Sequence, residues 1–216
     1  MKKISYLLMA FVFAASACFT ACEKDETENE NATLDDFVGT YDVSIKTISS
    51  ISEVIMGGET YNDVTMTLNA ISAATIEQQV RTSSELLDVA AKSYLDSIDW
   101  NSERLAQFSF KSANDSIGQN GWYSMLNSTY GYVKGGYIYM ASSDINGEYV
   151  LIFTQGMPWK ESGTATWKAY YLEQAFVKNL IEENVDEGFD YTKFDWASVL
   201  TGDVNYTELT FTATRK

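Results

Sequence analysis

Residues 40–46 read TYDVSIK, and this short stretch indicates the fold class. Tyr41, Val43 and Ile45 alternate with polar side chains, so an extended strand places them on one face and leaves the other face to water. The same period of two recurs in residues 64–69, 106–111 and 209–213. Repeated half-buried strands are typical of an antiparallel sheet that packs one face on a core. The chain is therefore expected to be mainly β.

The middle of the chain holds two runs that are apolar on both faces. Residues 136–141 (GYIYMA) and 148–154 (EYVLIFT) are separated by a turn-forming segment, so they are expected to pair as a hairpin covered on both sides. Further strands are expected at residues 75–81, 122–126 and 130–133.

Two segments follow helical spacing instead. Residues 83–98 carry apolar side chains three and four positions apart, and the capping box formed by Thr82 and Glu85 precedes these apolar residues. Residues 166–184 present a wide apolar face at the same spacing. Both segments are expected to form helices that pack on the sheet.

The N-terminal segment has the order of an export signal. Lys2 and Lys3 precede an apolar run over residues 6–17, which is shorter than the roughly 20 residues that a membrane-spanning helix needs. Residues 19–22, Phe-Thr-Ala-Cys, resemble the lipobox of bacterial lipoproteins. This resemblance implies a signal peptide over residues 1–21, followed by an acylated Cys22 that attaches the protein to membrane lipid. A short membrane anchor is the alternative.

An acidic tether follows the cysteine. Residues 23–33 (EKDETENENAT) have no apolar anchor, so residues 22–33 are expected to be a lipidated, disordered linker. Fully extended, such a linker spans on the order of 35 Å. Lys24, Asp25 and Glu26 resemble the export tag of surface lipoproteins in Bacteroidetes, which implies an outer-membrane protein exposed at the cell surface. Residues 34–216 then suit a single domain.

Composition excludes several classes of function. The chain has 15 basic and 30 acidic side chains, a net charge of −15, and no histidine. Such a charge repels nucleic acid, so no nucleic-acid partner is expected. The lack of histidine removes the common catalytic triads and His-ligated metal sites. No phosphate-binding loop or nucleophile elbow is present, so we expect no catalytic residues, no metal and no cofactor. Paired carboxylates of a glycosidase are a remote alternative.

The two ends of the domain resemble a known superfamily. Residues 34–41 (LDDFVGTY) are similar to the helical turn and Gly-x-Trp opening of lipocalins and other calycins, with Tyr41 in place of Trp. Arg215 stands where lipocalins often carry a basic residue that packs over that ring. The resemblance implies an antiparallel lipocalin-like barrel with two packed helices, closed by Tyr41 and Arg215. On pattern alone, an open antiparallel β-sandwich with helices is the alternative.

Aromatic residues crowd the middle strands and are the candidate ligand-binding residues: Trp122, Tyr130, Tyr132, Tyr137 and Tyr139. Tyr and Trp combine a flat apolar body with a polar tip, which suits a small hydrophobic ligand or a glycan. The plainer interpretation is that these residues are good strand formers. A non-catalytic surface lipoprotein with a ligand-binding barrel is therefore our first hypothesis. The alternative is an accessory subunit of an outer-membrane assembly whose barrel is filled with side chains.

One serine resembles a modification site. The triplet Asp115, Ser116, Ile117 is similar to the Asp-Ser-aliphatic sites that Bacteroidetes glycosylate on exported proteins. A second such triplet, residues 96–98, falls in an expected helix. Ser116 is therefore the candidate glycosylation site.

Acylation of Cys22 is directly testable. Because the lipobox-like residues direct cleavage before Cys22, the mature protein is expected to begin at this residue and to carry fatty acyl groups on it. Mass spectrometry of the purified protein measures both features. An unmodified Cys22 thiol in the exported protein contradicts the lipoprotein hypothesis.

Overall fold

The computed structural model describes residues 30–51, 54–56, 58–87, 99–142, 148–184, 194–200 and 204–216. The expected signal peptide, Cys22 and the tether up to residue 29 lie outside these residues. Within the part of the chain that is described, no helix is long and apolar enough to cross a bilayer.

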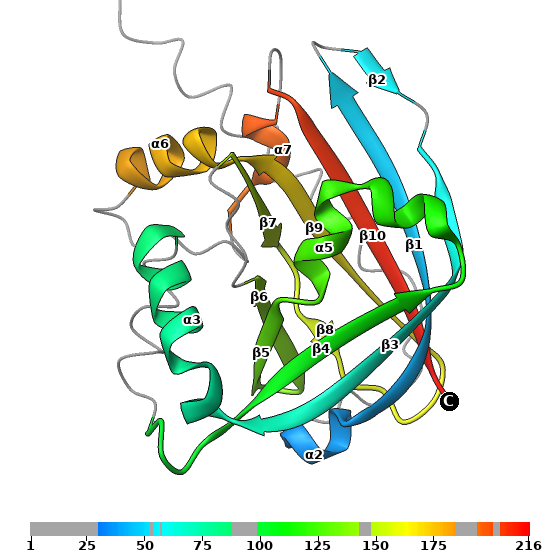
Figure 1. The fold of residues 1–216 in the computed structure, drawn as a ribbon, viewed down its shortest axis with the longest axis vertical. Helices are drawn as coiled ribbons and strands as arrows, with labels where there is room; N and C mark the ends of the chain where they lie inside the picture. The colour runs from blue at the N-terminus through cyan, green and yellow to red at the C-terminus, as the bar shows by residue number, and fades with distance from the viewer. Residues whose placement is uncertain are drawn as a thin grey trace, which may run out of the picture.

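One continuous antiparallel sheet makes up most of the molecule, and it curls into a half-barrel (Figure 1). Its strands follow the order β7-β9-β10-β1-β3-β4-β5-β6-β8, and β2 adds to β1. The bounds are β1 Gly39–Ile51, β2 Val54–Met56, β3 Thr60–Ser72, β4 Arg104–Ser112, β5 Thr129–Lys134, β6 Tyr137–Ser142, β7 Tyr149–Phe153, β8 Met157–Pro158, β9 Thr164–Glu173 and β10 Tyr206–Arg215. The prediction of a mainly β, antiparallel protein is confirmed.

The strands predicted from simple alternation are those at the centre of the sheet. β1 lies between β3 and β10, and its register with β10 runs from Tyr41 opposite Arg215 to Ser50 opposite Tyr206. The expected strands in residues 64–69, 106–111 and 209–213 lie within β3, β4 and β10. Their alternate apolar residues are buried, as the period of two requires.

Side chains fill the concave face of the sheet. Trp167 of β9 stacks on Phe211 of β10 with ring centroids 5.1 Å apart. Phe110 and Phe153 pack against the same Phe211 ring from β4 and β7, at 6.3 and 6.2 Å. Burial of each such side chain contributes about 1.5–3 kcal/mol to folding. The interior between these rings is therefore a packed core.

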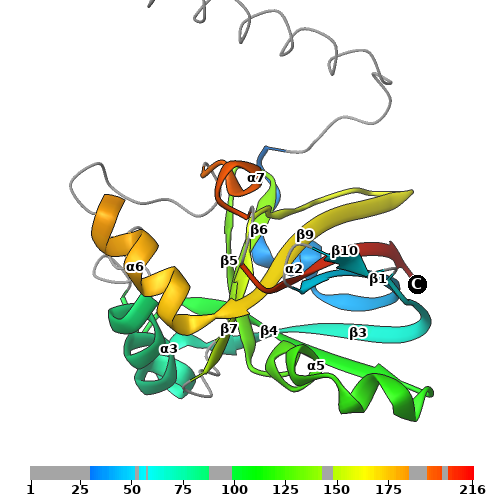
Figure 2. The same cartoon turned by 90° about the horizontal axis from the view of Figure 1, so that it is seen from above.

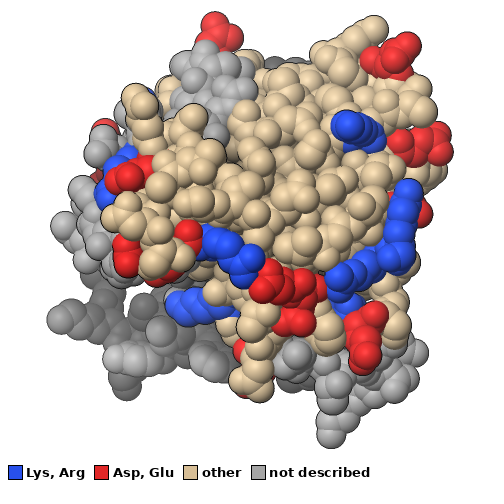
Figure 3. Space-filling model, turned by 60° about the horizontal axis from the view of Figure 1, so that its bottom comes forward, with Lys and Arg blue, Asp and Glu red and all other residues tan. Residues whose placement is uncertain are grey.

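Short helices cover the two ends of this core. At one end lies α2 (Leu34–Phe37), whose Phe37 is buried; Figure 3 brings this end forward and shows basic and acidic side chains interspersed around a neutral surface. The 3₁₀ helix η1 (Asp115–Gln119) and α5 (Gly121–Leu126) pack near Tyr61 and Phe110 instead. Trp122 of α5 meets Tyr61 edge-on, with centroids 5.9 Å apart.

Helices α3 (Ala73–Leu87), α6 (Gln174–Asn184) and the short α7 (Trp196–Val199) lie on the outside of the sheet. Helices α6 and α7 cover an apolar cluster that includes Val150 and Leu172. Helix α3 packs on a second cluster around Leu105 and Tyr130. Helices α3 and α6 touch each other on one side of the molecule in both views (Figures 1 and 2).

The expected helix over residues 83–98 differs from the observed one. Helix α3 begins at Ala73 and overlaps the expected helix only over residues 83–87. Residues 75–81, which were expected to form a strand, lie within this helix. Residues 88–98 lie outside the described residues. Ile76 and Val80 explain the difference, because they are four residues apart and pack on the same outer cluster.

One further prediction is right only in part, and two are wrong. Residues 166–173 of the expected helix over 166–184 lie in β9, which pairs with β7 on one edge and with β10 on the other; only residues 174–184 are helical. The expected hairpin does not form, because β6 pairs with β5 and β8 whereas β7 pairs with β9. Residues 122–126 lie in α5 and bury Trp122 in the core.

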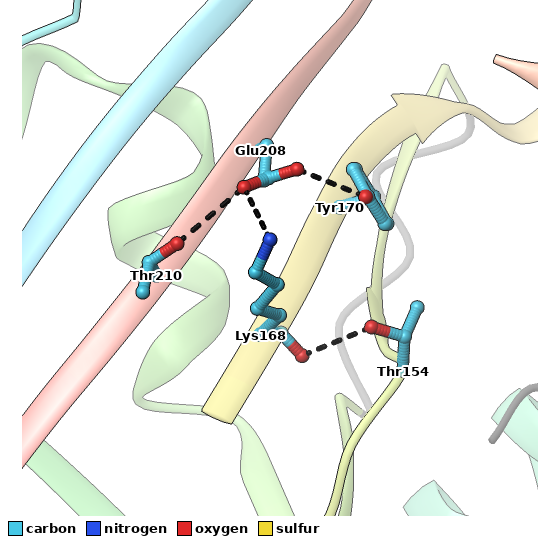
Figure 4. A network of polar contacts seen from close by, with 5 residues as sticks. All are labelled: Thr154, Lys168, Tyr170, Glu208 and Thr210. Atoms are coloured by element: carbon cyan, nitrogen blue, oxygen red, sulfur yellow. Dashed lines mark hydrogen bonds and ion pairs between the residues drawn. The ribbon is translucent and has the colours of Figure 1, made fainter. Parts of the chain in front are cut away.

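A polar network joins β9 to β10 on the outer face (Figure 4). The Glu208 carboxylate accepts hydrogen bonds from Lys168 Nζ and from the Tyr170 hydroxyl, both at 2.9 Å. Burial of this carboxylate opposes its ionisation, but the bonds from Lys168 and Tyr170 outweigh burial and lower the pKa of Glu208. Burial, together with the Glu208 carboxylate, raises the pKa of Tyr170. The ionised carboxylate therefore stabilises the strand pair.

Replacement of Glu208 tests this network. Glu208→Ala is expected to lower the free energy of unfolding by about 1–2 kcal/mol, because a half-buried tyrosine and lysine lose their acceptor. Urea unfolding at pH 7 measures the change. In the folded protein the pKa of Glu208 lies below its ordinary value of 4.5. The ionised Glu208 therefore stabilises the folded state fully above pH 4.5, and this stabilisation is lost as the pH falls through the lowered pKa.

The matched control is Glu173→Ala, which removes an exposed carboxylate from the end of β9, outside its pairing with β10. Equal stability of the two variants at pH 7 contradicts a stabilising role for the Glu208 network.

Candidate ligand pocket beside α2

A pocket of about 230 Å³ opens at the α2 end of the half-barrel. We call it the α2 pocket. Phe37 of α2, Tyr41 of β1 and Arg215 of β10 line one side, and Trp159 and Lys160 of the β8–β9 loop line another. The pocket lies where the edge strand β8 comes close to β9. It is therefore built at the seam where the curled sheet approaches itself.

Two alanines explain why the space is open. Ala165 of β9 and Ala213 of β10 are cross-strand partners, and both face the pocket. The next inward-facing pair along the same strands is Trp167 and Phe211, which fill the core. Small side chains at one level and large ones at the next leave the core closed and its end open.

Hydrogen bonds hold the walls of the pocket in place. The Arg215 guanidinium donates to the carbonyl oxygens of Asp36 and Val38 at 2.7 and 2.8 Å. The Trp159 indole Nε1 donates to the same Asp36 oxygen at 3.2 Å, and the Tyr41 hydroxyl donates to Phe37 O. Arg215, Trp159 and Tyr41 thus satisfy carbonyl groups at the end of α2 that have no partner within the helix.

The start of α2 is fixed as well. The Asp36 carboxylate accepts hydrogen bonds from the backbone N–H and the hydroxyl of Thr33, at 2.7 and 2.8 Å. These two bonds, with a further contribution from the positive charge of Arg215, lower the pKa of Asp36. The helix that carries Phe37 is thereby capped at both ends, so this wall of the pocket is preorganised.

Arg215 also affects the phenol of Tyr41. Burial raises the pKa of Tyr41, and the positive charge of Arg215 opposes that shift. The guanidinium therefore exerts its field on the pocket wall. The two residues predicted to close the barrel are direct cross-strand partners in β1 and β10. Both line the α2 pocket.

The predicted aromatic ligand-binding residues lie elsewhere and do not form one site. Trp122 is buried in α5 within the core, and Tyr130 is buried under α3. Tyr132 and Tyr139 are cross-strand partners whose rings stack at 5.6 Å, and Tyr137 lies 6.3 Å from Tyr139.

These three tyrosines lie on the outer face of the sheet. The intervening residues of β6, Ile138 and Met140, are buried in the interior core, as the period of two predicts. Tyr132 packs against the cluster under α3. Tyr132, Tyr137 and Tyr139 therefore pack on one another outside the half-barrel and do not line its interior.

Ser116 is exposed in η1. Its backbone N–H and its hydroxyl both reach Asn114 Oδ1, at 3.0 and 2.7 Å, and Ile117 beside it is buried. Among the described residues, no group of acidic or cysteine side chains is arranged to hold a metal ion. Comparisons with protein-family models, curated proteins and solved structures find no match for this chain.

Several pocket residues had no place among the sequence predictions. Trp159 follows Pro158, the single proline of the chain, and that neighbourhood was the available signal for a structured loop. Ala165 and Ala213 had no signal of their own, because alternation identifies an inward position and not the volume left around it. The lining of a pocket depends on which strands come together.

Filling the pocket tests its geometry. Ala213→Leu is expected to change the free energy of unfolding by less than about 1 kcal/mol, because the added methylenes enter open space. The matched control Ala169→Leu adds the same atoms to a buried position of the filled core that does not line the pocket, and it should cost about 1–3 kcal/mol. Thermal or urea unfolding compares them. Equal losses in both variants contradict an open space at Ala213.

Proposed function

We propose that the protein is a non-catalytic, lipid-anchored lipoprotein of the bacterial outer-membrane surface that captures a compact ligand in the α2 pocket. The ligand is the end of a glycan or a small hydrophobic molecule. The observation that carries this proposal is a preformed pocket with an aromatic wall at the end of an otherwise filled half-barrel.

The chemistry of the lining supports a ligand with one flat or apolar face. Phe37, Met157 and Trp159 offer apolar surface, and Arg215 and Lys160 offer hydrogen-bond donors beside it. Ligand sites generally combine a mostly apolar lining with a few convergent polar groups. The α2 pocket has this combination.

The size of the pocket sets the size of the ligand. Sites for drug-sized molecules occupy roughly 300–1,000 Å³. The α2 pocket, at about 230 Å³, suits a single sugar unit or a short acyl chain. The filled core behind Ala165 and Ala213 gives no room for a long chain to extend inward.

The filled interior also favours the second candidate, an accessory subunit of an outer-membrane assembly. In that case the half-barrel serves as a rigid scaffold, and the outer face provides the contacts. The dense aromatic packing around Phe211 is the observation that supports it.

Ligand titration distinguishes the two candidates. Saturation-transfer NMR or calorimetry with a panel of monosaccharides, disaccharides and short fatty acids is expected to find binding to the wild-type protein. Ala213→Leu is expected to abolish it, because the leucine occupies the ligand's volume.

Thr212→Leu is the matched control, since it makes a comparable change one residue away on the opposite face of β10. It should bind as the wild type does. A protein that binds no member of the panel, or a ligand that still binds Ala213→Leu, contradicts capture in the α2 pocket and favours the scaffold.

A further inference from the structure

The lining of the α2 pocket departs from the charge of the whole chain. The protein carries a net charge of −15, yet the pocket is lined by two cations, Lys160 and Arg215, and one carboxylate, Glu161. Glu161 is exposed, whereas Lys160 is half-buried. The pocket is therefore locally cationic within an acidic protein.

Neither Lys160 nor Arg215 is held in an ion pair by the residues that the structure describes. Nearby charged groups are paired with other residues: Asp35 with Arg104 and Asp42 with Lys216, each at 2.8 Å. The carboxylate of Asp36 bonds Thr33 instead. Asp35, Asp36 and Asp42 thus bond other groups, and Glu161 of the lining forms no ion pair with Lys160 or Arg215. The charge of Arg215 acts on Asp36 without an ion pair between them, so both cations can still bind an anion.

Arg215 is held rigidly while it keeps donors to spare. Its two hydrogen bonds to Asp36 O and Val38 O go to neutral carbonyls, so they fix the guanidinium without cancelling its charge. A guanidinium has five N–H donors in a planar fork, and this arrangement matches the two oxygens of a carboxylate. A fixed cation loses little conformational entropy when it binds an anion.

From this arrangement we infer that the ligand of the α2 pocket carries an anionic group, a carboxylate, which is bound by Lys160 and Arg215. The ring or chain that bears it packs on Trp159 and Phe37. This inference rests on the proposed function and names its ligand class. An acidic sugar and a short fatty acid share this chemistry.

Matched pairs of charged and neutral ligands test the inference and distinguish an acidic sugar from a fatty acid. The full-length protein is titrated by calorimetry with glucuronate against glucose and with hexanoate against hexanol. The charged member of at least one pair is expected to bind about tenfold more tightly. A preference for glucuronate identifies an acidic sugar, and a preference for hexanoate identifies a fatty acid. Added sodium chloride should weaken binding of the charged member of the pair and leave binding of the neutral member unchanged.

Charge variants locate the effect. Lys160→Gln should weaken binding of the charged ligand about three- to tenfold and leave its neutral analogue unchanged. Lys46→Gln makes the same change in net charge on β1, roughly 16 Å along the strand from Tyr41 of the pocket wall. It should have no effect on binding of the charged ligand. Equal weakening by both variants overturns a specific role for Lys160.

The outcomes also separate this inference from the proposed function. If neutral and charged ligands bind equally well, and Ala213→Leu abolishes binding of both, the inference of an anionic ligand is wrong. Capture of a ligand in the α2 pocket then remains supported. Failure of every member of both pairs to bind in an Ala213-dependent way overturns both.

Discussion

The pairing of β1 with β10 joins the two ends of the domain and organises the elements around them. It places Arg215, next to the C-terminus, directly opposite Tyr41. From that position the guanidinium reaches Asp36 O and Val38 O, so a residue from the end of the chain caps a helix from its beginning. Because β1 also pairs with β3, the same strand connects this closure to the rest of the sheet.

The contrast between core and pocket arises within a single pair of strands. Trp167 and Phe211 stack where β9 and β10 cross the interior, whereas Ala165 and Ala213 face each other at the next inward position. Protein interiors pack to nearly crystalline density, so the alanine pair leaves a space that no neighbouring side chain fills.

Preorganisation gives this small pocket its chemical character. Trp159, Tyr41 and Arg215 each form a hydrogen bond to the backbone of α2. These side chains are therefore already ordered in the folded protein, and binding in the pocket would cost them little further conformational entropy. The outer tyrosines lie away from this pocket. The rings of Tyr132, Tyr137 and Tyr139 pack on one another, and Tyr132 also packs against the cluster under α3. Cross-strand aromatic pairs of this kind stabilise a sheet.

The ambiguity of β9 shows where local pattern stops being informative. Its inner face carries Trp167 and Ala169, and its outer face carries Tyr170 and Leu172 under α6. A strand that is apolar on both faces has no period of two, so it resembles an apolar helix. Helix α5 is too short for any periodicity to identify it, and the neighbours of β6 and β7 depend on contacts between distant segments.

Residue order alone determined the mainly β class and the central strands β1, β3, β4 and β10. These features follow from local alternation, which needs no knowledge of distant contacts. Tertiary structure decided the strand β9, the helix α5, the separation of β6 from β7, and the α2 pocket. The physical reason is volume: whether Ala165 and Ala213 border an open space depends on the side chains that distant strands bring beside them.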